Sequence, residues 1–261
     1  MTSASPDLVL RLAGSERDLR AAQRLRYRVF VQELGAGGAS ADHEAEIEAD
    51  AYDPHVDHLL LIDRRRDPAT LEDVVGVYRL LPAERADALG GFYSEGEYDL
   101  GPLRRGGRRL LELGRSCVHP DYRGGAALHL LWNGLAGYVI GGGHEVLFGV
   151  ASFHGTDPAP IAQALGLLHH RHLAPPDLRP RARPERFQPM DMIAAGDLDA
   201  RTAMRTMPPL IRAYLRLGGV VGEGAWIDHA FNTTDVCLVL DTGAISSRLR
   251  DLYARGAGGK A

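Results

Sequence analysis

The sequence predicts an α/β protein with a mixed sheet and flanking helices. Runs of β-branched and other apolar residues interleave with segments of helical periodicity, and short connections join them. The chain has 261 residues, which is enough for one large domain or two small ones. Because neither an internal repeat nor a long linker divides it, we expect one domain over residues 8–253 and a flexible glycine-rich tail over residues 254–261.

The first half of the chain has clear helix boundaries. Ser15 is a helix N-cap candidate with Asp18 three residues on, and Gly35 ends the same helix. Residues 35–53 are predicted to form an acidic loop, and residues 86–103 a second loop with a short helical turn. The predicted strands cover residues 8–12, 58–64, 74–82 and 110–118, and the predicted helices cover residues 17–34 and 126–140.

The second half continues the alternation of strands and helices. Proline at the start and glycine after the end mark a helix over residues 208–217. Residues 154–158 are expected to turn, and residues 171–186, rich in arginine and proline, to be irregular. The other predicted elements are strands over residues 145–153, 225–228 and 235–241, and helices over residues 160–170 and 244–256.

Composition excludes several classes of protein. The net charge of −4 gives no general case for binding nucleic acid. Only two cysteines occur, Cys117 and Cys237, which suits a reducing cytoplasm rather than a disulfide framework. The first ten residues lack the pattern of a signal peptide, and no apolar run reaches the length of a membrane span. We therefore expect a cytoplasmic protein.

Two charges lie in a segment that otherwise resembles a buried strand. Glu112 and Arg115 occur in LELGRSCV, residues 111–118. In a regular strand these side chains would point to opposite faces. A β-bulge near Gly114 would bring them to the same side.

Buried charges need partners, and the rest of the chain offers them. Arg79 lies in an otherwise apolar strand, and the simplest alternative for it and Arg115 is an arginine at a sheet edge reaching water. For several charges together a site is the better interpretation. The other candidates are Arg26 of the first helix and the acidic-loop residues Glu48, Asp50 and Asp53.

The order of these motifs resembles a known family. LRYRVF, EADAYD, VVGVYRLL and LELGRSCV, in this order, are similar to the acyl-homoserine-lactone synthases, which have the GNAT N-acyltransferase fold. GGFYSEGEYDL, ASFHGTDP and GAWIDHAFNTTDV resemble more closely the ornithine-acyl-ACP N-acyltransferases. The resemblance covers residues 8–253. It implies a GNAT-like fold with a splayed central strand, and transfer of a (3-hydroxy)fatty acyl group from acyl carrier protein to the α-amine of ornithine, giving lyso-ornithine lipid.

The donor turn departs from the usual GNAT pattern. Typical members carry Arg/Gln-x-x-Gly-x-Gly/Ala to hold the pyrophosphate of coenzyme A, whereas this chain has Arg123, Gly124 and Gly125 followed by two alanines. The changed spacing favours the acyl-phosphopantetheine of acyl carrier protein over acyl-CoA as donor, with no permanently bound cofactor. Because the turn opens a helix, its N–H groups could hold a phosphate, although a plain strand–turn–helix connection is the alternative.

Aminolysis of a thioester assigns a role to each remaining candidate. Glu112 is the candidate base for the amine, with Arg115 beside it in sequence. The backbone N–H groups of Cys117 and Val118 are candidates for stabilising the oxyanion. The predicted substrate-binding residues are Arg26, Asp50, Asp53, Arg79 and Ser116, with Asp50 and Asp53 as partners of the ornithine side-chain ammonium and the arginines as partners of carboxylates.

Alternatives remain open at this stage. Cys117 could be a covalent nucleophile or an inert buried thiol. The enzyme alternatives are an acyl-homoserine-lactone synthase using S-adenosylmethionine and a GNAT acyltransferase using acyl-CoA; the non-catalytic alternative is a binder of acyl chains or carrier protein. The histidines at 169–172 lack zinc-site spacing, so no metal site is predicted. Residues 171–186 carry five arginines against two carboxylates, which suits acidic carrier protein, an anionic membrane, or simply a solvated loop.

Overall fold

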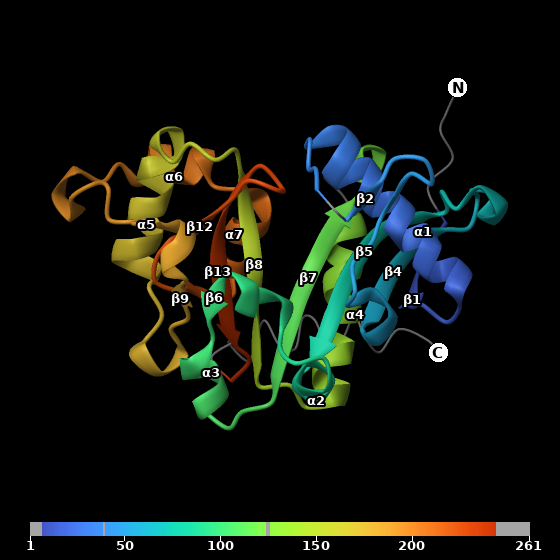
Figure 1. Ribbon diagram of the computed structural model, residues 1–261, viewed down its shortest axis with the longest axis horizontal. Coiled ribbons are helices and arrows are strands. Elements are labelled where there is room, and N and C mark those ends of the chain that lie inside the picture. The colour runs from blue at the N-terminus through green and yellow to red at the C-terminus, as the bar shows by residue number, and fades with distance from the viewer. Residues whose placement is uncertain (1–6, 39, 124–125, 244–261) are drawn as a thin grey trace. The chain divides into compact units, whose positions relative to one another are not determined.

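The computed structural model describes residues 7–38, 40–123 and 126–243, which form two compact units (Figure 1). The first unit contains residues up to Leu81 together with Leu113–Gly143, and the second contains Pro82–Glu112 together with residues 144–243. The strand β7 (Leu110–Val118) has residues in both units. The predicted helix at 244–256 and the predicted tail at 254–261 lie outside the described residues, and the single domain over 8–253 stays a prediction.

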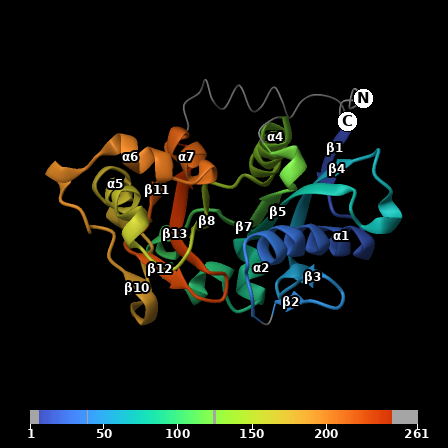
Figure 2. The same cartoon turned by 90° about the horizontal axis from the view of Figure 1, so that it is seen from above.

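The first unit is a sheet covered by a helix on each face. The sheet order is β1-β4-β5-β7, and the pairs β1–β4 and β4–β5 are antiparallel. Leu60 and Ile62 pack in one apolar core with Ala21, Ala22 and Leu25 of α1. Figure 2 shows α1 and α4 on opposite sides of these strands. The elements are β1 (Leu8–Leu12), α1 (Glu16–Arg26), β4 (Asp57–Asp63), β5 (Val74–Pro82) and α4 (Ala126–Gly142).

Two glycines let α4 approach the sheet. A Cβ atom at Gly76 of β5 would lie 2.9 Å from Leu131 Cδ1, and one at Gly134 of α4 would lie 2.1 Å from Leu10 Cδ2. Both distances are shorter than real Cβ contacts, so a larger residue at either position would force the facing leucine side chain to move.

The first predicted helix is two kinds of helix in sequence. Ser15 caps α1 by accepting from the Asp18 N–H, as predicted. After Arg26 the chain continues as a π-helix, η1 (Tyr27–Glu33), and Gly35 follows with φ +73°. The predicted helix and its end at Gly35 are confirmed, whereas the change to a π-helix after Arg26 was not predicted, because apolar periodicity does not distinguish a widened turn.

The second unit holds the other part of the sheet. Its order is β7-β8-β13-β12-β10, with β11 also paired to β13. β7 and β8 are parallel over three residue pairs, Leu110–Glu112 with Val146–Phe148, whereas β8–β13, β12–β13 and β10–β12 are antiparallel. The strands are β8 (Val146–His154), β10 (Phe187–Gln188), β11 (Val220–Val221), β12 (Ala225–Asp228) and β13 (Thr233–Asp241). The predicted mixed sheet is confirmed.

The helices of the second unit correct several boundaries. α5 and α6 pack against each other, and α7 contacts β13. α5 begins two residues later than predicted, β13 begins two residues earlier, and α6 was not predicted. The helices are α2 (Ala83–Ala88), α3 (Gly101–Arg105), α5 (Ala162–His172), α6 (Ala200–Thr206) and α7 (Pro209–Arg216).

Short strands organise two segments that were predicted to be loops. β2 (Ala41–Asp42) pairs with β3 (Ile47–Glu48) inside the acidic loop. β6 (Tyr98–Asp99) pairs with β9 (Arg181–Ala182), which joins the segments expected to be loop and irregular. Two-residue strands carry too little pattern to be recognised from sequence. Among the described helices, none has both the length and the apolar composition needed to cross a membrane.

Candidate active site

Three arginines and three carboxylates of the first unit form one ion-pair network, here called the arginine–carboxylate cluster. Its members are Arg26, Glu48, Asp50, Asp53, Arg79 and Arg115. Arg26 Nη1 lies 2.7 Å from Asp53 Oδ1, and Arg26 Nε donates to Glu48 at 2.5 Å. The predicted association of these segments is therefore present in the structure.

Arg79 and Arg115 complete the cluster from two strands. Arg79 Nη1 donates to Asp50 Oδ2 at 2.6 Å and lies 3.3 Å from Asp53 Oδ1. Arg115 Nε donates to Glu48 Oε1 at 3.2 Å, and its Nη2 donates to Asp50 Oδ2 at 3.1 Å. Because the charges balance, the cluster neutralises itself inside the first unit.

Burial and the neighbouring arginines act in opposite directions on the pKa values of the cluster's aspartates. Burial raises the pKa of Asp53, but Arg26, Gln23 and Arg79 outweigh it and hold the pKa well below its usual range. The same opposition lowers the pKa of Asp50, where Arg79 and Arg115 supply the positive charge. Both carboxylates are therefore ionised and already matched with guanidinium groups.

The cluster members differ in how much side-chain surface they expose. The side chains of Arg26 and Asp53 are 0% and 1% exposed, so a direct contact with substrate, predicted for both, has no surface to act through. Arg79 is nearly as buried. Asp50 and Arg115 keep side-chain exposures of 16% and 9%, so their predicted substrate contacts remain geometrically open.

The backbone of β7 is irregular one residue after Gly114. Arg115 has φ +48°, a left-handed conformation that is uncommon for a residue other than glycine. A Cβ atom at Gly114 would lie 3.6 Å from Arg79 Nε, so the strand passes close to that guanidinium. The predicted bulge near Gly114 thus corresponds to a break in strand geometry at Arg115, with its side chain held by Glu48 and Asp50.

Glu112 lies in the second unit and is held by one turn. Its carboxylate accepts from the Tyr93 N–H at 2.9 Å, from the Ser94 N–H at 2.6 Å, and from the Ser94 hydroxyl. Its residue exposure is 4%. Hydrogen bonds of this kind favour the ionised form. The sequence analysis quoted the motif that contains Tyr93 and Ser94 but did not assign either residue a role.

Ser116, Cys117 and Val118 occupy the end of β7. Ser116 and Val118 are partly exposed and Cys117 is buried. Burial raises the pKa of the Cys117 thiol to about 12, although nearby Arg26 opposes the shift. The thiol is therefore protonated near neutral pH, which argues against the covalent route.

The donor turn is only partly described. Arg123 pairs with Glu33 through Nη1 and Nη2 at 2.5 and 2.7 Å, and its Nε donates to the Val118 carbonyl at 3.0 Å. The guanidinium is thus engaged within the first unit. Gly124 and Gly125 lie outside the described residues, so the predicted phosphate contact of this turn stays a prediction.

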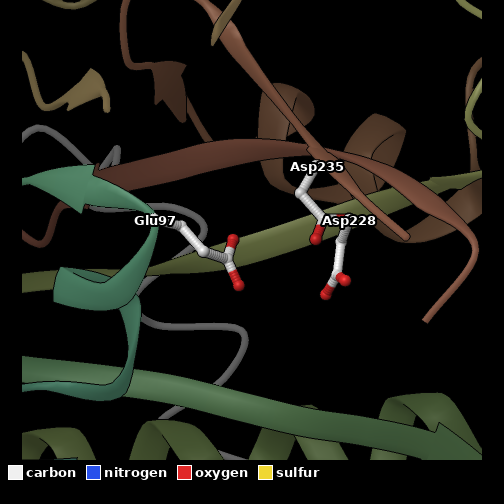
Figure 3. Close-up of side chains that lie close together, drawn as sticks. All are labelled: Glu97, Asp228 and Asp235. Carbon is white, nitrogen blue, oxygen red and sulfur yellow. The ribbon is translucent and has the colours of Figure 1, made fainter. Parts of the chain in front are cut away.

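A second group of carboxylates was not predicted from sequence. Glu97, Asp228 and Asp235, here called the carboxylate triad, are all buried and each offers an oxygen within 4.8 Å of the others. Figure 3 shows the three carboxylates directed toward one another, from the segment beside β6 and from β12 and β13. An oxygen-only set of this kind can hold a cation, either a metal ion or an ammonium group.

Comparison with known proteins identifies the family of this chain. Residues 25–133 match the family described as Acetyltransferase (GNAT) domain. The chain is 57% identical over 260 residues to the L-ornithine N(alpha)-acyltransferase of Rhodobacter capsulatus, with 100% of both chains covered. The chain belongs to the L-ornithine N(alpha)-acyltransferase family. A second member, from Brucella abortus, is 44% identical and matches 96% of this chain and 90% of its own length.

A solved structure supports the fold of this family member. A CoA-dependent acyl-homoserine lactone synthase superposes with a TM-score of 0.54 at 16% identity, covering 97% of this chain and 91% of its own. At this identity the likeness concerns the fold alone. The predicted GNAT-like fold and the prediction of an acyltransferase are both confirmed.

Proposed function

We propose that this acyltransferase transfers a fatty acyl group to the α-amine of ornithine by direct aminolysis of a thioester. The observation that carries the proposal is the 57% identity, over the full length of both chains, to an L-ornithine N(alpha)-acyltransferase. The named activity of that relative is compatible with the oriented carboxylate of Glu112 in the second unit and, taken separately, with the protonated thiol of Cys117 in the first.

The reaction needs a neutral amine and a proton for the leaving thiolate. An α-amine with an ordinary pKa of about 8 is mostly protonated near neutral pH. Glu112 accepts that proton, directly or through a water, and the amine nitrogen then forms a bond to the thioester carbon. As the C–S bond breaks, the thiolate takes the proton held by Glu112 and leaves as a thiol, and the nitrogen loses its second proton to solvent to give the neutral amide. The backbone N–H groups of Cys117 and Val118 are proposed to stabilise the oxyanion.

The arginine–carboxylate cluster has a supporting role in this proposal. Arg26, Glu48, Asp53 and Arg79 hold Asp50 and Arg115, and through Arg115 they maintain the irregular backbone of β7. Asp50, Arg115 and Ser116 keep enough exposure to contact the substrate. A substrate carboxylate is the group that Arg115 would bind, in competition with Glu48 and Asp50, to which its Nε and Nη2 donate.

Acyl carrier protein is the proposed donor, and lyso-ornithine lipid the proposed product. The donor turn at Arg123–Gly125 lacks the spacing typical of coenzyme A binding. In the basic segment, residues 171–186, Arg181 pairs with Glu223, and Arg186 lies over the Trp226 ring. Arg171 is exposed and is the first candidate for contact with an acidic partner, whether carrier protein or anionic lipid.

Product analysis tests the proposal directly. The purified protein is incubated with 3-hydroxyacyl carrier protein or the same acyl-CoA, and with ornithine, lysine, glycine or S-adenosylmethionine. Mass spectrometry should detect Nα-acylornithine, formed faster from the carrier-protein donor. Acyl-homoserine lactone as the main product, or no product with any amine, would overturn the proposal; a faster reaction from acyl-CoA would overturn only the donor assignment.

A further inference from the structure

The strand register places the carboxylate triad on one face of the second unit's sheet. Asp228 of β12 is the direct partner of Thr233 on β13, and Trp226 is the direct partner of Asp235. Direct partners in an antiparallel pair share a face, as do residues two apart on one strand. Asp228, Thr233 and Asp235 therefore face the same side, and Glu97 meets them from the segment beside β6 (Figure 3).

Thr233 adds an independent sign that this cluster receives a ligand. The residue is only 8% exposed, and its hydroxyl has no hydrogen-bond partner among the residues that the structure describes. A buried hydroxyl without a partner is costly, and it can accept a hydrogen bond from a bound N–H donor. Its register partner Asp228 is fixed in place, because Asp228 Oδ1 accepts from the Ala230 N–H at 2.7 Å and the Phe231 N–H at 3.3 Å.

Solvent reaches this face of the sheet beside the triad. On β8, Ser152 is the direct partner of Asp235, and His154 is the direct partner of Thr233. Ser152 and His154 are both exposed, whereas Asp235 and Thr233 are buried. The buried pair Asp235 and Thr233 thus has solvent-exposed neighbours on the adjacent strand.

Glu97 of the triad and the candidate base Glu112 both affect the ionisation of Cys237 in the second unit. Cys237 lies two residues beyond Asp235 on β13 and shares its face. Burial raises the pKa of the Cys237 thiol, and the charges of Glu112 and Glu97 raise it further. Cys237 therefore senses the charge of the candidate base and of one member of the triad.

From this arrangement we propose that the carboxylate triad, with Thr233, binds the side-chain ammonium of the acceptor and selects a diamino acid. The inference rests on the proposed acylation of ornithine. A primary ammonium has three N–H donors, and the triad and Thr233 offer oxygen acceptors around one space. The predicted ammonium partners Asp50 and Asp53 already form ion pairs with arginines. Their negative charge is therefore less available to a substrate ammonium group.

Selectivity between ornithine and norvaline tests the assignment, because norvaline has the same carbon chain without the side-chain amine. The measured quantity is the ratio of kcat/KM for the two acceptors with one acyl donor. Asp228→Asn, Glu97→Gln and Thr233→Val should each lower the ratio, the carboxylate variants by roughly tenfold to one-hundredfold. Asp191→Asn, an exposed carboxylate of the same unit, is the matched control and should keep the ratio.

A binding measurement separates this inference from the proposed function. Calorimetry should show that the protein binds ornithine more tightly than norvaline, and that Asp228→Asn loses the difference, even if the protein acylates neither. Folded triad variants that keep both the ratio and the binding difference would overturn the inference. Loss of Ca²⁺ or Mn²⁺ binding in Asp228→Asn with an unchanged ornithine-to-norvaline ratio would overturn it in favour of a metal site.

Discussion

Arg26 and Asp53 form an ion pair without solvent contact, with Arg26 Nη1 2.7 Å from Asp53 Oδ1. The pair joins the last residue of α1 to the loop that precedes β4. The chain changes from α-helix to π-helix directly after Arg26, so the guanidinium is anchored where the helix geometry changes. Removing either partner unbalances a buried cluster, because among the described residues Arg26 would keep only Glu48 and Asp53 only Arg79 as ion-pair partners.

Breaking this pair should lower stability strongly. We expect Arg26→Met or Asp53→Asn to reduce the free energy of unfolding by about 3–5 kcal/mol, measured by urea denaturation. Arg64→Met is the control, because Arg64 pairs with Asp7 at the exposed surface, where an ion pair contributes little to stability. Equal losses for the buried and exposed pairs would contradict the interpretation of the cluster.

The stability of the protein should fall in acid, in part because of Asp53. Its pKa is depressed in the folded state, so its contribution is complete above the unfolded pKa of about 3.9 and decreases as the pH falls below it. The Arg11 guanidinium is the main cause that lowers the pKa of Asp18 to about 2. Asp18 therefore also makes the stability fall as the pH decreases.

Comparison with Asp53→Asn isolates the effect of Asp53 from other titrating groups. The difference in free energy of unfolding between the protein and this variant should be constant from pH 7 to 5 and should shrink from about pH 5 downward, because a protonated aspartate resembles asparagine. Denaturation curves recorded at intervals down to pH 2.5 measure it. A difference that grows as the pH falls would contradict the depressed pKa.

Glu112→Gln should slow acyl transfer without abolishing the fold. Loss of a general base reduces kcat by about a hundredfold to ten-thousandfold. The control is Glu185→Gln, an exposed glutamate of the same unit. Ser94→Ala removes one of the donors to Glu112 and should have a smaller effect on kcat. Unchanged kcat in a folded Glu112→Gln variant would exclude the base role.

Cys117→Ala should keep most of the activity. The thiol is buried and its pKa is raised to about 12, so a thiolate is scarcely populated near neutral pH. Intact-protein mass spectrometry after mixing with the acyl donor should show no acyl adduct that depends on Cys117. Cys237→Ala is the matched control, since Cys237 is equally buried. Loss of both the adduct and the activity in Cys117→Ala alone would establish the covalent route instead.

The fold could be predicted where the sequence pattern is long and continuous. β1, β5 and β7 occupy the predicted residues, because runs of apolar residues between turns define a buried strand. The π-helix η1, the helix α6 and the two-residue strands β6 and β9 were not predicted. Their existence depends on packing and on distant pairing partners rather than on local preference.

The candidate site, like the fold, could be predicted from the sequence only in part. By itself the sequence determined which charges in apolar surroundings require partners, and Arg26, Asp53, Arg79 and Arg115 do meet in one cluster. Only the tertiary structure decided that Arg26 and Asp53 have no exposed surface, because burial depends on how helix, loop and strands pack together.

The carboxylate triad depends wholly on tertiary structure. Glu97 precedes Asp228 by more than a hundred residues, and sheet register, rather than sequence spacing, brings Asp228 and Asp235 onto one face. Each residue taken alone resembles an ordinary acidic residue near the end of a short strand or turn. The sequence therefore determined the family and the strand that carries Glu112 and Arg115, whereas the folded sheet decided where negative charge gathers, because charges distant in the chain become neighbours only when strands pair.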